Sequence, residues 1–234
     1  MKPGMAVPRA AAALALLAGC GQVPVFGQAQ TMAKGAHRME IMLERHEAGA
    51  RHTIDPGLVL DQGDQVRFRF RTNFDGYLYV SNQSTSGKYE QLFPREETGQ
   101  ENRIAAGQEY RVPATAAAFR IAGPAGHEVV YWLVSPARLN DIPPRLGLPG
   151  AKSPPHTLIP RCDDERLKAR GDCVDTSAGP KLVPRDVDMP QGLSDAATRS
   201  QRDLMFMRQQ DKAVISSPEP LTGPVIYEFR LAHR

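Results

Sequence analysis

The sequence lacks an apolar run long enough to cross a lipid bilayer as a helix. Such a helix needs about 20 consecutive apolar residues, and the main apolar stretch, 10–17, is much shorter. A strong excess of one charge is also missing, because 29 Lys and Arg stand against 26 Asp and Glu, a formal net charge of +3. Nucleic-acid binding would need a clustered basic surface, so we expect no nucleic-acid partner.

No pattern typical of a catalytic site is present. The hydroxyl-rich segment 81–87 lacks the Gly-x-Ser-x-Gly elbow and a placed histidine. Glu96, Glu97 and Glu101 lie in one short segment, which is typical of surface charge rather than of a glycosidase pair. Asp163-Asp164-Glu165 does not have the spacing of a calcium loop. We therefore predict a protein that is not an enzyme and uses no cofactor; the alternative is an envelope hydrolase that its sequence does not reveal.

Cysteine is scarce, with three residues in the chain. Cys20 follows the apolar run near the N-terminus, which leaves Cys162 and Cys173 as a pair. Exported compartments are oxidising, so we predict a disulfide between these two. Closing a loop of this length contributes about 3 kcal/mol in the chain-entropy model. The alternative is a metal site of His156, Cys162 and Cys173, although the paired spacing usual for zinc ligands is absent.

The N-terminus has the plan of a bacterial lipoprotein signal. Lys2 and Arg9 precede the apolar run, and Leu17-Ala18-Gly19-Cys20 closes it where a lipobox places the thiol that receives a diacylglyceryl group. We predict that 1–19 is a signal peptide, that Cys20 is lipidated and that 20–38 is a tether. The alternative is ordinary cleavage after Ala29, which would discard Cys20 and leave a soluble periplasmic or secreted protein.

The lipid anchor also suggests a location. A multiply acylated cysteine holds a protein to a membrane stably, since each buried methylene contributes about 0.8 kcal/mol. Gly21 and Gln22 follow Cys20, and no aspartate is present there to signal retention in the inner membrane. We therefore expect the protein in the cell envelope, attached through its acyl chains to the outer membrane and facing the periplasm.

Beyond the tether, the chain has the period-two alternation of β-strands. The clearest case is Val66-Arg67-Phe68-Arg69-Phe70-Arg71, and a second is 76–81. Pairing these two as a hairpin with Phe70 opposite Leu78 puts the apolar residues on one face. The other face then carries the pairs Arg69–Tyr79 and Arg71–Tyr77. We expect a loop around 73–75, with Gly76 free to adopt positive φ.

Further short strands are predicted along the chain, at 39–45, 89–93, 109–112, 118–121 and 128–135. Turn-forming clusters separate them, and the chain contains 20 prolines and 20 glycines. This spacing is typical of an antiparallel β-sandwich. Both faces of 128–135 are apolar, which predicts a central strand.

The predicted fold is therefore all-β, a mainly antiparallel β-sandwich in a single domain. Its core is 39–138, and 224–234 is a C-terminal strand that returns to the same sheet. Between them, 139–223 is predicted to be a long irregular Pro-rich elaboration that contains the disulfide. It has room for one short helix, for which Ser194 is a candidate cap, although 204–207 fits a strand equally well.

A stretch of the core resembles a known family. Five blocks carry the resemblance: Gln62-Gly63-Asp64-Gln65-Val66-Arg67-Phe68, Asp75-Gly76-Tyr77-Leu78-Tyr79-Val80, Leu92-Phe93-Pro94, Asn102-Arg103-Ile104-Ala105-Ala106-Gly107 and Gly123-Pro124-Ala125-Gly126-His127-Glu128. In order and spacing they resemble the bacterial domain of unknown function family 4384, from 61 to 135. The resemblance implies a β-rich interaction module and transfers no catalytic residue.

These observations favour a lipid-anchored cell-envelope protein that acts as a non-catalytic binding module. The predicted Arg–Tyr face, made by Arg69, Arg71, Tyr77 and Tyr79, is its candidate interface, because arginine and tyrosine are enriched at binding hot spots. Another envelope protein or polymer is the expected partner. There are two alternatives to a binding role for this face. The Arg–Tyr pairs only stabilise a solvent-exposed sheet, or part of 139–223 covers the face. A structural accessory lipoprotein of a surface layer or secretion apparatus is the alternative function.

Overall fold

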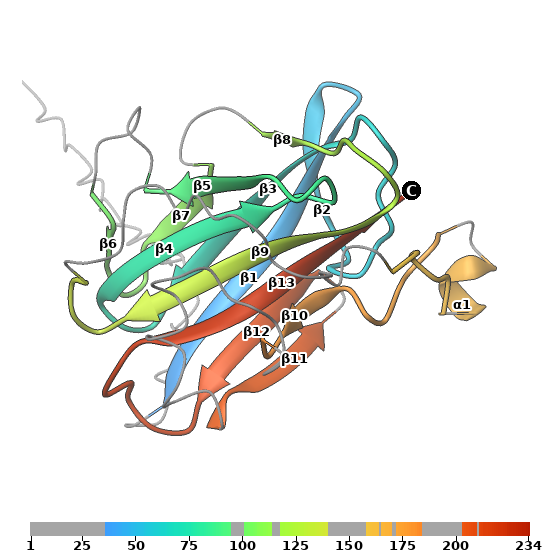
Figure 1. The fold of residues 1–234 in the computed structure, drawn as a ribbon. Coiled ribbons are helices and arrows are strands. Elements are labelled where there is room, and N and C mark those ends of the chain that lie inside the picture. Colours follow the sequence, from blue (N-terminus) through green and yellow to red (C-terminus); the bar gives the residue numbers. More distant parts are fainter. Residues whose placement is uncertain are drawn as a thin grey trace, which may run out of the picture. The chain divides into compact units, whose positions relative to one another are not determined.

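The computed structural model of the protein describes residues 36–94, 101–113, 118–139, 158–163, 165–169, 172–183, 203–209 and 211–234. The predicted signal peptide, Cys20 and most of the tether lie outside these residues, and so does His156. The described strands form two antiparallel sheets that pack face to face (Figure 1). The predicted antiparallel β-sandwich is therefore confirmed.

The first sheet, called here the β1 sheet, runs in the order β11-β12-β1-β3-β7, with β2 paired to β1 and β8 paired to β3. Its strands are β1 (His37–Glu47), β2 (Ala50–Ile54), β3 (Gln65–Thr72), β7 (Glu109–Val112), β8 (Phe119–Arg120), β11 (Met205–Gln209) and β12 (Lys212–Ser217). All of its pairings are antiparallel.

The second sheet, called here the β9 sheet, runs in the order β10-β13-β9-β4-β5, with β6 paired to β4. Its strands are β4 (Gly76–Gln83), β5 (Tyr89–Phe93), β6 (Arg103–Ile104), β9 (Gly126–Ser135), β10 (Gly179–Lys181) and β13 (Val225–His233). Every residue of β9 and of β13 is buried. The apolar character of both faces of 128–135 is thus explained by its place between β13 and β4.

The core lies between the sheets and is built around aromatic side chains. Alternation in β3 turns Val66, Phe68 and Phe70 inward, all fully buried. The rings of Phe68 and Phe70 meet Trp132 of the opposite sheet edge-on, each with centroids 5.4 Å apart. The same alternation turns the arginines of β3 outward, so this strand positions both the core and the charged surface described below.

The predicted hairpin of β3 and β4 is wrong. The two strands belong to different sheets, and 73–75 carries the chain from one sheet to the other. The physical reason is Phe74, which would be exposed at the tip of a hairpin. It is instead 8% exposed and stacks on His37, with ring centroids 4.3 Å apart. Burial of this ring favours a connection that crosses the end of the sandwich.

Gly76 does not adopt the positive φ that we predicted. A Cβ atom at this position would lie 2.8 Å from the carbonyl oxygen of Ser135, which is closer than real Cβ contacts. Glycine is therefore needed here because β4 and β9 approach each other closely at this end.

The described residues of 139–223, a segment predicted to be irregular, include β10, β11, β12 and a short helix, α1 (Glu165–Lys168). Ser194, the candidate helix cap, lies outside the described residues, and 205–209 forms a strand. The strands β11 and β12 pair with each other, and β12 continues the β1 sheet beside β1. The prolines that suggested irregularity lie outside these strands, with the exception of Pro180 in β10. Pro180 is tolerated because β10 is an edge strand, where one missing backbone donor leaves no partner unsatisfied.

Candidate functional site

The outer face of the β1 sheet carries a lattice of alternating charges. Register places Arg71 opposite Glu40 and Arg67 opposite Glu44, with Arg69 opposite Met42 between them. On its other side, β3 meets β7, whose Glu109 and Arg111 point the same way. The outward positions of three neighbouring strands thus bring charges together from segments that are distant in sequence.

Ion pairs join six cations to three carboxylates on this face, which we call the arginine face. Its members are Arg38, Arg67, Arg69, Arg71, Arg111, Lys212, Glu40, Glu44 and Glu109. Glu40 is shared by three cations, whereas Glu44 and Glu109 are each shared by two. Among the residues that the structure describes, the members of these ion pairs therefore carry an excess of three positive charges.

The carboxylates of the two central pairs lie beneath their arginines. The side chains of Glu40 and Glu44 are 11% and 8% exposed, whereas that of Arg71 is 56% exposed. Burial alone would raise the pKa of Glu40, but Arg71, Arg38 and Lys212 outweigh it, and the pKa lies below its ordinary value. Glu40 thus holds the Arg71 guanidinium at the surface, whereas Arg67, with 14% of its side chain exposed, lies nearly as deep as its partner Glu44.

Arg69 and Arg71 therefore lie on the surface, but Tyr77 and Tyr79 do not lie beside them. The tyrosines point outward from β4, on the outer side of the β9 sheet. The Tyr79 hydroxyl donates to the carbonyl oxygen of Leu139 and accepts from its amide nitrogen, both at 3.1 Å. The predicted Arg–Tyr pairs do not exist, because the chain crosses between sheets at 73–75.

Sequence reasoning missed the carboxylates that complete the arginine face. Glu40 and Glu44 sit on alternate positions of β1, and Glu109 and Arg111 do so in β7. That alternation is visible in the sequence, but the strand order that places both beside β3 is not.

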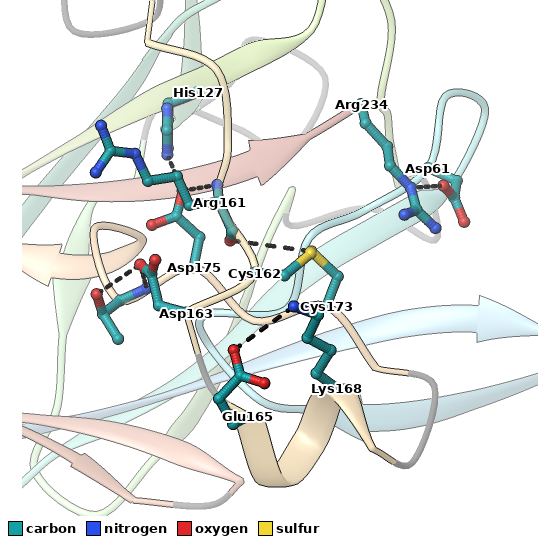
Figure 2. The surroundings of a disulfide bond; sticks show 11 residues. Asp61, His127, Arg161, Cys162, Asp163, Glu165, Lys168, Cys173, Asp175 and Arg234 are labelled. Carbon is teal, nitrogen blue, oxygen red and sulfur yellow. Dashed lines mark hydrogen bonds and ion pairs between the residues drawn. A yellow bond between two sulfur atoms is a disulfide. The ribbon is translucent and has the colours of Figure 1, made fainter.

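The predicted disulfide between Cys162 and Cys173 is present (Figure 2). It closes the segment that follows the β-sandwich core, and α1 lies within the loop. The backbone of this segment is hydrogen-bonded to the loop before β3, where the amide of Val59 donates to the carbonyl oxygen of Cys173 at 2.7 Å. The disulfide therefore stabilises the described residues of 158–177, which we call the disulfide segment.

A buried histidine fastens the disulfide segment to β9. The ring of His127 is fully buried, with Nδ1 3.1 Å from the carbonyl oxygen of Leu158 and Nε2 3.1 Å from Oδ2 of Asp175. Asp175 also accepts from the amides of Arg161 and Ser177, at 3.0 and 2.7 Å. Figure 2 shows Asp175 between His127 and Arg161. Burial lowers the pKa of His127, although Asp175 opposes this shift.

Ser177, His127 and Asp175 do not have the geometry of a catalytic triad. The Ser177 hydroxyl and the Asp175 carboxylate both meet Nε2 of His127, at 3.1 Å each. In a triad the acid orients one ring nitrogen so that the other can take the proton of the nucleophile. Here the second nitrogen faces the carbonyl oxygen of Leu158. The cluster is arranged to join two segments of the chain.

A buried ion pair lies on the outer side of β13, where β10 runs alongside it. Glu228 is fully buried and pairs with Arg230, which is 8% exposed. Burial raises the pKa of Glu228, and Arg230 and Lys181 only partly offset this. The alternation of 225–231 predicts a strand, and the structure shows that both of its sides are buried.

The structure also bears on metal binding and on membrane-spanning helices. In the part of the chain that it describes, no group of three or more His, Cys, Asp or Glu side chains is placed to hold a metal ion. The two cysteines of the alternative zinc site are joined in the disulfide. None of the described helices is long and apolar enough to span a bilayer.

The fold and its surfaces define a class: an antiparallel β-sandwich domain with one charged sheet face and one face covered by a disulfide-closed segment. A comparison with protein-family models gives a match to part of this domain. Residues 59–138 match the model of the domain of unknown function DUF4384, which confirms the resemblance. This match extends from the loop before β3 through β9 and includes Arg69, Arg71 and Arg111. Comparisons with curated proteins and with solved structures give no match.

Proposed function

We propose that this protein is a lipid-anchored, non-catalytic binding module of the bacterial cell envelope, and that its arginine face binds an acidic surface of another envelope protein. The observation that supports this most is the excess of three positive charges, with Arg71 and Arg111 more than half exposed. Arginine is also enriched at interface hot spots, where its planar guanidinium binds carboxylates through paired hydrogen bonds.

The competing explanation is that these ion pairs only stabilise the sheet. Exposed ion pairs contribute about 0–1 kcal/mol each, and a sheet stabilised in this way needs no more cations than carboxylates. Within the described part of this face, the three cations in excess add to the repulsion among its positive charges, which costs stability unless an anionic group offsets it. The imbalance therefore favours binding over stabilisation alone.

The anchor is tested by changing Cys20 to Ala in the full-length chain. We expect wild-type protein in the membrane fraction and the variant in the soluble fraction, because the variant has no thiol to acylate. Intact-mass analysis of the wild type should give a product that begins at Cys20 and carries acyl chains. A mature product that begins at Gln30 would contradict the anchor and leave the binding face untouched.

The binding face is tested by charge reversal at its two most exposed arginines, in the variant Arg71→Glu/Arg111→Glu. Crosslinking in cells followed by mass spectrometry should recover the acidic partner with the wild type and at least tenfold less of it with the variant. Binding of the purified partner should also weaken as salt rises from about 0.05 to 0.5 M, because screening shortens the reach of surface charges.

The matched control is Lys168→Glu/Arg234→Glu, which makes the same change in net charge. These side chains are 57% and 62% exposed, against 56% and 54% for Arg71 and Arg111. We expect the control to keep its partner within twofold of the wild type. Equal loss in both variants would show a net-charge effect, and unchanged recovery with Arg71→Glu/Arg111→Glu would rule out this face. A crosslinked species without protein would contradict a protein partner.

A further inference from the structure

A cavity of about 360 Å³ opens between the two sheets at the end of the sandwich where β8 lies. This volume is in the range of small-molecule sites, which are about 300–1,000 Å³. A second hollow, near His37 and Phe74, has about 20 Å³, enough for a single water molecule. The large cavity lies apart from the arginine face, which is on the outside of the β1 sheet.

Apolar and polar groups occupy different parts of the cavity wall. Its interior is lined by the buried residues Leu92, Val130, Leu231 and Glu128. Its rim carries the exposed residues Lys88, Glu90 and Arg120. Glu128 follows the alternation of β9 that turns Val130 and Trp132 toward the core, so a carboxyl group occupies an interior position of the sheet.

Acceptor atoms without a protein donor surround this carboxyl group. Glu128 is 7% exposed and receives only two hydrogen bonds, from Nδ2 of Asn82 at 2.7 Å and from the amide of Thr85 at 3.3 Å. Oδ1 of Asn82 and Oγ1 of Thr85 are buried without a hydrogen-bond partner. Buried polar atoms normally find partners. Of these residues, Glu128 and Asn82 line the cavity. An ammonium group offers three donors and would supply the carboxylate with the hydrogen bonds that the protein does not.

We propose that this cavity binds a small organic cation, a primary ammonium group on a short apolar body. The ammonium pairs with Glu128, and the apolar body packs on Leu92, Val130 and Leu231. Lys88 and Arg120 at the rim disfavour a second positive charge there, which selects ligands with a single cationic head.

Binding of an ammonium group should be coupled to the protonation of Glu128. Burial raises the pKa of Glu128, and the hydrogen bonds from Asn82 and Thr85 only partly offset this. Nε2 of His233 lies 3.8 Å from Oε1 of Glu128, but burial lowers the pKa of His233, which favours the neutral ring. The other charged groups facing the cavity are Lys88, Glu90 and Arg120. Pairing with an ammonium stabilises the carboxylate, so binding should release a proton from Glu128.

The experiment compares hexylammonium with its neutral counterpart 1-hexanol, by calorimetric titration of the full-length protein at pH 6. Titrations in buffers of different ionisation enthalpy report the protons released. We expect hexylammonium to bind at least tenfold more tightly than 1-hexanol, with net proton release for the amine alone. Glu128→Gln keeps the size and hydrogen-bonding capacity of the side chain. It should lose at least tenfold in affinity for the amine and be unchanged toward the alcohol.

Glu90→Gln at the rim is the matched control, and we expect its affinity for the amine to stay within twofold of the wild type. Equal affinities of the wild type for the two ligands would overturn the proposal. The absence of hexylammonium binding at concentrations up to roughly 10 mM would overturn it as well. An unchanged affinity of Glu128→Gln for hexylammonium would overturn it as well. If Glu128→Gln fails to fold, the two-ligand comparison and the proton release in the wild type still decide.

Discussion

Changing Phe68 to Ala is expected to lower the free energy of unfolding by about 3–5 kcal/mol, the usual cost of emptying a buried aromatic position. The ring is fully buried and meets three other rings, with centroid distances of 6.0 Å to Phe119, 5.4 Å to Trp132 and 5.1 Å to Phe229. Trp132 and Phe229 belong to the opposite sheet. The substitution therefore leaves a cavity in the layer that joins the two sheets.

Urea unfolding followed by tryptophan fluorescence measures this loss, because Trp132 is the only tryptophan in the chain and packs on Phe68. Arg71→Ala is the control: it changes the same strand on its opposite face, where the side chain is 56% exposed. It should cost less than about 1 kcal/mol, because Glu40 keeps its ion pairs with Arg38 and Lys212. Phe68→Leu keeps most of the volume and should lie between the two. A loss below 1 kcal/mol for Phe68→Ala would mean that the sheets do not meet through this ring.

The sequence was most informative where one strand alone decides the outcome. The alternation of β3 correctly predicts that Phe68 and Phe70 are buried and that Arg69 is at the surface. The apolar residues on both faces of β9 correctly predict a central strand. These features depend only on which way successive side chains point, and that is set by the period of the strand.

Pairing between strands was much less predictable. A hairpin and a crossing between sheets both satisfy the alternation of β3 and β4, and only the burial of Phe74 distinguishes them. For the same reason, the predicted outward orientation of Tyr79 is correct, but its predicted position beside Arg69 is wrong, because β4 belongs to the β9 sheet. The burial of the outer side of a strand is equally hidden: the alternation of β13 predicts a strand, but not that Glu228 is fully buried.

Changing Arg230 to Met is expected to lower the free energy of unfolding by about 3–5 kcal/mol at pH 8, the usual cost of leaving a buried charge without its partner. Glu228 is fully buried, and its Oε2 atom has no hydrogen-bond partner even in the wild type. In the register of β10 and β13, Lys181 is opposite Glu228, but burial lowers the pKa of Lys181. This amine is therefore a poor substitute for the guanidinium.

The loss should shrink as the pH falls. Burial already raises the pKa of Glu228 above its ordinary value of 4.5, and removing Arg230 raises it further. Between pH 4.5 and the raised pKa the folded protein binds a proton that the unfolded chain has released, so stability falls as the pH rises through this window. Below pH 4.5 the carboxyl is neutral in both states. The variant should accordingly be closer to the wild type at pH 5 than at pH 8.

The double variant Arg230→Met/Glu228→Leu tests whether the loss comes from the unpaired carboxylate or from lost packing. Replacing both partners of a buried pair with apolar side chains is often neutral or stabilising, so we expect the double variant to recover most of the stability at pH 8 and to lose the pH dependence of the single variant. Lys168→Met breaks an exposed pair in α1, with side chains 57% and 80% exposed, and should cost less than about 1 kcal/mol. A single variant whose loss is the same at pH 5 and pH 8 would show that Glu228 is not the source. In that case the methylene groups of Arg230, packed under the disulfide segment, would carry the stabilisation.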